Sequence, residues 1–133
     1  MNIYDGKLSS IIAVIGTIST WLFGVWDLAL IGLITLMVAD YLLGIIKGYT
    51  LKELSSTKGF KGLAKKSGIL IVLIVAVVLD RLLSNGTWVF RSLVCYFYIA
   101  NEALSILENC SVIGLPVPQQ IKKALQQLRE ESK

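Results

Sequence analysis

The side chains of this chain that could do chemistry follow one face of a segment near residue 100. Six of them recur at steps of four, three, four, three and four residues: Arg91, Cys95, Tyr98, Glu102, Ser105 and Asn109. This spacing predicts a single stripe along a helix. In apolar surroundings such a stripe either packs against other helices or lines an aqueous path. Adding nearby polar residues, the candidates for assembly or pore lining are Asp40, Arg91, Tyr98, Asn101, Glu102, Ser105, Glu108 and Asn109.

Catalytic and metal-binding chemistry has little support in the residue types. The chain has no histidine, and its two cysteines, Cys95 and Cys110, do not have metal-ligand spacing. On one helix they would lie about 22 Å apart, too far for a disulfide. No nucleophile stands beside a base. We therefore expect neither an enzyme nor a bound metal or cofactor.

The elements that position the stripe must tolerate very apolar surroundings. Of 133 residues, 55% are hydrophobic and 17% charged, with a mean hydropathy of +0.71. A water-soluble domain of this size needs more polar surface, whereas a bilayer removes that need. The sequence has no stripe of interleaved basic and aromatic residues, so we do not expect nucleic-acid binding. The expected partner is the lipid bilayer.

Apolar runs and their interruptions predict an all-α integral membrane protein that forms a single domain over residues 1–133. A basic loop over 47–66 and a tail over 114–133 with a short amphipathic helix complete it. The first segment contains Ser9, Ser10 and Thr17, which lower its hydrophobicity, so it either spans or lies on the surface. We expect four transmembrane helices, or three in the second case, over residues 8–26, 28–46, 67–84 and 87–107.

Charge placement predicts the topology. The 47–66 segment has six lysines against the single Glu53. Short loops rich in lysine stay cytoplasmic, and an even number of spans then puts both termini inside as well. Along antiparallel spans, Asp27 and Arg91 fall at the outer level. Glu102 falls at the inner level with Asp40, and we expect it either to pair with a lysine such as Lys65 or to be protonated.

Small residues indicate where helices approach closely. Gly44 and Gly48 stand four apart in the second predicted span. Small residues at this spacing favour helix association in lipid. The contact lies either between copies in a homo-oligomer or within one chain.

Several motifs between Asp40 and Leu128 resemble the toxin-secretion and phage-lysis holins. Ala103 stands where glycine is as frequent in that family, and the segment before Asp27 matches little, so the number of spans stays open. The resemblance rests on Asp40-Tyr41-Leu42-Leu43-Gly44, on Leu54-Ser55-Ser56 with Gly59, Gly62, Lys65 and Lys66, on Asp80, on the run from Phe97 to Asn109, and on Gly114, Pro116 and Pro118.

The resemblance implies a non-enzymatic, multi-pass protein of the host cytoplasmic membrane. It would self-associate and open lesions through which an endolysin, or a large toxin, reaches the cell wall, without a stable contact to that endolysin. Two alternatives remain: a small transporter or channel that stays intact, and an antiholin-type regulator.

Overall fold

The computed structural model describes residues 2–83 and 86–131. The described residues are helical with short connections and contain no strand, which confirms the all-α expectation. The helices are α1 (Ile3–Phe23), α2 (Leu28–Thr50), α3 (Ser56–Leu83), α4 (Val89–Val112) and α5 (Gln119–Glu131).

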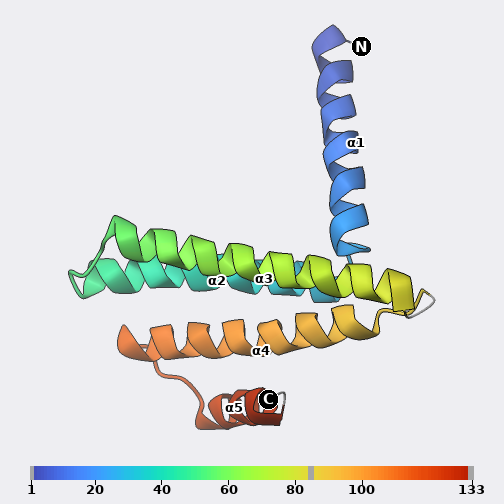
Figure 1. Ribbon diagram of the computed structural model, residues 1–133. Coiled ribbons are helices and arrows are strands. Elements are labelled where there is room, and N and C mark those ends of the chain that lie inside the picture. The colour runs from blue at the N-terminus through green and yellow to red at the C-terminus, as the bar shows by residue number, and fades with distance from the viewer. Residues whose placement is uncertain (1, 84–85, 132–133) are drawn as a thin grey trace.

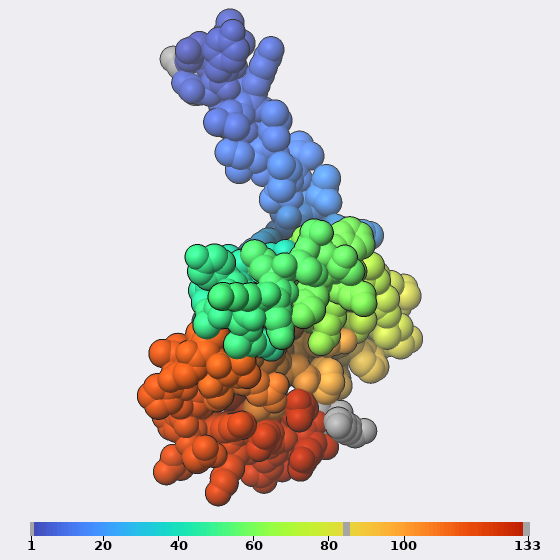
Figure 2. Space-filling model, turned by 90° about the vertical axis from the view of Figure 1, so that its left-hand side faces the viewer, coloured from blue at the N-terminus to red at the C-terminus, as the bar shows by residue number. Residues whose placement is uncertain are grey.

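Three helices pack side by side, while α1 stands apart. Figure 1 shows α2, α3 and α4 running alongside one another, with α5 folded back beneath α4 and α1 projecting away from the other side. The end view in Figure 2 shows these layers in order, from α1 through α2 and α3 to α4 and α5. No residue of α1 is buried within the chain. The packed unit that positions the polar residues is therefore α2–α4.

A small apolar core holds the three helices together. One buried residue from each helix, Leu33 of α2, Leu73 of α3 and Cys95 of α4, is 0% exposed. Aliphatic residues at steps of three and four supply the rest of this core. Cys95 acts here as a small apolar side chain, and both cysteines are free.

Among the described residues, three helices are long and apolar enough to cross a membrane: α1, α2 and α3. The mean hydropathy of their best windows is 1.4, 2.2 and 2.2. The segment predicted as a fourth span does form a helix, α4, but it is not one of these three. Its polar stripe places ionisable and amide side chains among the apolar ones, so it lacks the composition of an isolated span.

Helices extend into both ends of the segment predicted as a basic loop, residues 47–66. Helix α2 continues to Thr50, and α3 already begins at Ser56. The Ser55 hydroxyl accepts a hydrogen bond from the Lys58 amide at 3.1 Å, which caps α3 at its start. Most of the lysines in this segment therefore lie on helices, and residues 51–55 connect α2 to α3. At the other end of α3, Ser84 of the predicted third span lies outside the described residues, as do residues 132–133 of the predicted tail.

Candidate functional site

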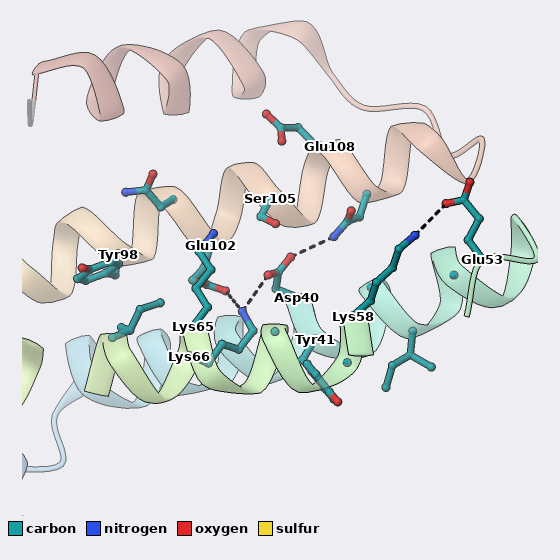
Figure 3. A pocket seen from close by; sticks show the side chains of 18 of the residues that line it. Asp40, Tyr41, Glu53, Lys58, Lys65, Lys66, Tyr98, Glu102, Ser105 and Glu108 are labelled. Carbon is teal, nitrogen blue, oxygen red and sulfur yellow. Dashed lines mark hydrogen bonds and ion pairs between the residues drawn. The ribbon is translucent and has the colours of Figure 1, made fainter. Parts of the chain in front are cut away.

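One lysine joins three helices at the centre of the polar region (Figure 3). The Lys66 ammonium of α3 donates to Asp40 Oδ2 of α2 at 2.9 Å and to Glu102 Oε2 of α4 at 2.6 Å. The side chains of Lys66, Asp40 and Glu102 are 14%, 14% and 6% exposed. The lysine that pairs with Glu102 is thus Lys66, one position along from the Lys65 named above.

Two further side chains extend this group, which we call the Lys66 cluster (Asp40, Lys47, Lys66, Glu102 and Asn109). The Asn109 amide donates to Asp40 Oδ1 at 3.1 Å, and Lys47 Nζ donates to Asn109 Oδ1 at 3.4 Å. Two ammonium groups and two carboxylates make the cluster neutral in sum. Buried charges are tolerated only when paired and hydrogen-bonded, and this network provides both.

A second polar group surrounds Arg91, whose side chain is buried. Its guanidinium donates to both carboxylate oxygens of Asp27 at 2.9 and 3.0 Å. It also donates to the carbonyls of Phe23 and Val25, each at 2.7 Å, and lies over the Trp88 ring. Hydrogen bonds from Arg91 lower the pKa of Asp27, although partial burial opposes the shift. Arg91 therefore ties α4 to the connection between α1 and α2.

Two arginines cap the end of α1. The last carbonyls of a helix lack partners within it. Arg81 of α3 donates to the Trp21 carbonyl at 2.8 Å, and Arg91 of α4 satisfies the Phe23 carbonyl. Cations at this end also interact favourably with the helix dipole. These caps, together with Phe23, which packs against the core, attach α1 to the bundle.

Asp80 has a role that the sequence did not reveal. Its two carboxylate oxygens accept the backbone amides of Phe90 and Arg91 at 2.9 and 2.7 Å. Asp80 therefore satisfies the first turn of α4 from the end of α3. The sequence indicated Asp80 only as an aspartate at the end of an apolar run and as part of the family resemblance. Its role could not be predicted because the amides that it accepts lie 10 and 11 residues further along the chain.

A cavity of about 500 Å³ opens beside the Lys66 cluster, between α2, the start of α3, α4 and α5. Arg91 does not reach it. The other seven candidates line it: Asp40, Tyr98, Asn101, Glu102, Ser105, Glu108 and Asn109. The stripe thus divides between two polar groups, with Cys95 in the core between them.

The two candidate glycines lie in different surroundings. A Cβ at Gly44 would meet no atom within 4 Å, so this position is open on the surface of α2. A Cβ at Gly48 would lie 3.4 Å from Leu54 Cα, in the connection to α3. Gly48 therefore allows a close approach within the chain. Tyr41, which the sequence indicated only as part of the family resemblance, packs on Gly59 and Gly62 of α3.

Apolar helices joined by buried charge pairs define a small helical membrane protein. The described residues contain no group of acidic, cysteine or histidine side chains suited to a metal ion. The chain belongs to the bacteriophage holin family, whose sequence pattern matches residues 17–130.

The chain is also similar to individual proteins, one of which is named as a probable holin. The chain is 56% identical over 117 residues to a Clostridium perfringens protein named as an uncharacterized 14.9 kDa protein in the nagH 3′ region, covering 88% of this chain and 89% of the relative. It is 35% identical over 101 residues to a probable holin of Bacillus phage phi105, covering 75% and 73%. No solved structure matches the chain.

Proposed function

We propose that this protein is a holin that self-associates in the cytoplasmic membrane of a host bacterium. Its assemblies open lesions through which an endolysin, or a large toxin, reaches the cell wall. Family membership is the observation that carries the proposal. The composition supports it, since the chain is strongly apolar and its buried charges are paired. Holin family members are expected to be non-enzymatic, and the endolysin needs no stable contact with this chain.

The membrane placement that we propose has α2, α3 and α4 crossing the bilayer together. Although α4 has too many polar groups for an isolated span, Arg91, Glu102 and Asn109 are hydrogen-bonded to other elements of the chain. Pairing of this kind lowers the cost of polar groups in hydrocarbon. The lysine-rich end and α5 then face the cytoplasm.

Helix α1 supplies the fourth span in this proposal, which puts both termini in the cytoplasm. Its hydroxyls support immersion in lipid, because Thr17 and Thr20 donate to carbonyls of their own helix at 2.8 and 2.9 Å. They need no outside partner. Since α1 projects away from the bundle (Figure 1), insertion beside α2 requires rotation at the connection around Gly24.

An intact transporter or channel is the second candidate, favoured by the polar cavity, and an antiholin-type regulator is the third. Inducible expression in a bacterium with a co-expressed endolysin separates the three. A holin stops growth abruptly at a set time and releases the endolysin. A transporter leaves the membrane sealed to proteins, and a regulator delays lysis by a separate holin without causing lysis itself.

A further inference from the structure

The start of α3 is strongly positive. Lys58, Lys61, Lys65 and Lys66 all lie in its first turns, and no acidic residue accompanies them in the first turn. The N-terminus of a helix is the positive end of its dipole, so cations there are unfavourable. Lys58, in the first turn, therefore costs the helix stability unless an anion outside it compensates.

Few of these charges have partners within the chain. Lys66 is fully engaged in its cluster. Lys58 approaches only Glu53 at 3.6 Å, and both side chains are mostly exposed, at 68% and 59%. An exposed pair of this kind is weak. Over the described residues, Lys61 and Lys65 form no ion pair within 4 Å.

Some of the uncompensated cations line the cavity beside the Lys66 cluster. Lys58 and Lys65 rise from α3 along its wall (Figure 3), and Arg129 of α5 lines it as well. Arg129 Nε is buried without a hydrogen-bond partner. The carboxylates on the wall outside the Lys66 cluster are Glu53, which pairs weakly with Lys58, and Glu108, and both are exposed. The cations available to a ligand therefore outnumber the available acids.

The same cavity has apolar walls. Ile45 and Leu54 line it from α2 and the following turn, and Phe97 lines it from α4. Ile45 and Leu54 are exposed, so the apolar wall continues onto the outer surface of the bundle. A ligand that fits needs an anionic group at one end and hydrocarbon at the other.

We propose that this cavity binds the headgroup of an anionic phospholipid, with its phosphodiester against Lys58, Lys65 and Arg129. The acyl chains then leave along Ile45 and Leu54. This inference rests on the proposed membrane placement, in which the lysine-rich end meets the cytoplasmic leaflet. Anionic lipids are attracted to that side, and basic pockets between spans bind their headgroups.

The test compares two charge-matched double variants of the full chain, with native Arg129 in both. Lys58→Gln with Lys65→Gln removes two lysines from the cavity wall. Lys52→Gln with Lys61→Gln removes two from the same region that do not line the cavity. Binding of phosphatidylglycerol and of phosphatidylcholine to the purified protein in neutral detergent is measured by native mass spectrometry across a lipid titration.

We expect wild type to bind phosphatidylglycerol selectively. The cavity variant should lose about 30-fold in affinity, at about 1 kcal/mol for each lysine, while the control variant stays near wild type. Equal losses in both variants would mean diffuse surface attraction and overturn the site. Equal binding of the two lipids also overturns it, as does complete displacement by inorganic phosphate at the lipid's own concentration.

The lipid assay does not depend on lysis. Selective binding together with failure to release endolysin would reject the proposed function and leave the site standing. Normal lysis without selective binding would reject the site alone.

Discussion

Lys66 is the residue on which the packing of three helices depends most, because it bonds to α2 and α4 at once. Replacing it with methionine keeps the length of the side chain but leaves Asp40 and Glu102 buried without a cation. Breaking a buried ion pair by removing one partner costs about 3–5 kcal/mol. We expect Lys66→Met to lower the free energy of unfolding in detergent by this order. Lys61→Met, an exposed position on the same helix, should change it little, and equal stability of the two variants would contradict the assignment.

Glu102 is the buried charge on which we expect assembly to depend. Glu102→Ala removes a charge, which eases insertion, but it also removes the hydrogen bond to Lys66. The variant should insert normally and fail to form the functional assembly. If Glu102→Gln behaves like wild type, hydrogen bonding at this position suffices; if it fails like Glu102→Ala, the charge itself is needed. Membrane fractionation measures insertion, cross-linking measures assembly, and the time of lysis measures function. Normal lysis timing for Glu102→Ala would mean that the stripe serves ordinary packing.

Asp27 gives the fold an acid-sensitive contact in the polar group around Arg91. Its pKa in the folded chain is lowered from 3.8, chiefly by the hydrogen bonds from Arg91. The resulting stability is present above the pKa of the unfolded chain and is lost as the pH falls through the lower folded value. We expect wild type to lose stability below about pH 4 in excess of Asp27→Asn. The effect is small because the Asp27 side chain is 43% exposed, and parallel pH profiles of unfolding would contradict it.

At the scale of elements, the apolar runs predicted where helices lie better than where they end. The span predicted over residues 28–46 corresponds to α2, which continues to Thr50 because the Leu51 amide bonds to the Lys47 carbonyl at 2.9 Å. Lysine and glycine suggested a loop, but neither prevents helical hydrogen bonding. The attachment of α1 through arginine caps could not be predicted, since it depends on groups 60 and 68 residues away in the sequence.

The connection at Gly24 sets how α1 leaves the bundle. Its φ of +81° is strained for other residues, and a Cβ there would lie 2.9 Å from Arg91 Nε. Gly24→Ala should therefore displace Arg91 and loosen α1. Paramagnetic labels at Ser10 and Val78, in a background without the native cysteines, should report a broader distance distribution. Gly16→Ala has open space around it and serves as the control; an unchanged distribution in Gly24→Ala would show that the arginine caps do not position α1.

At the scale of the whole molecule, charge pairing turns the polar stripe inward and leaves an apolar exterior. The sequence predicted that the stripe and Asp40 share a region, and the structure places Asp40 with Glu102 and Asn109. The choice of Lys66 over Lys65 could not be predicted, because adjacent helical residues point about 100° apart and only the packing decides which faces inward. The exterior of α1, α2 and α3 is left for lipid or for other copies of the chain.

Replacing Gly44 with a bulky residue tests whether copies of the chain associate through α2. The surroundings of Gly44 within the chain are empty, so Gly44→Leu should leave the fold of one copy intact. A bulky side chain at a close helix contact costs about 1–3 kcal/mol, which lowers the association constant by roughly 5-fold to 150-fold. We therefore expect smaller oligomers in cross-linking and an altered lysis time.

Gly32→Leu, an equally open position on α2, is the matched control. Because Gly44 also borders the cavity, lipid binding is measured in parallel. Unchanged oligomer size and timing in Gly44→Leu would exclude this face of α2 from the assembly.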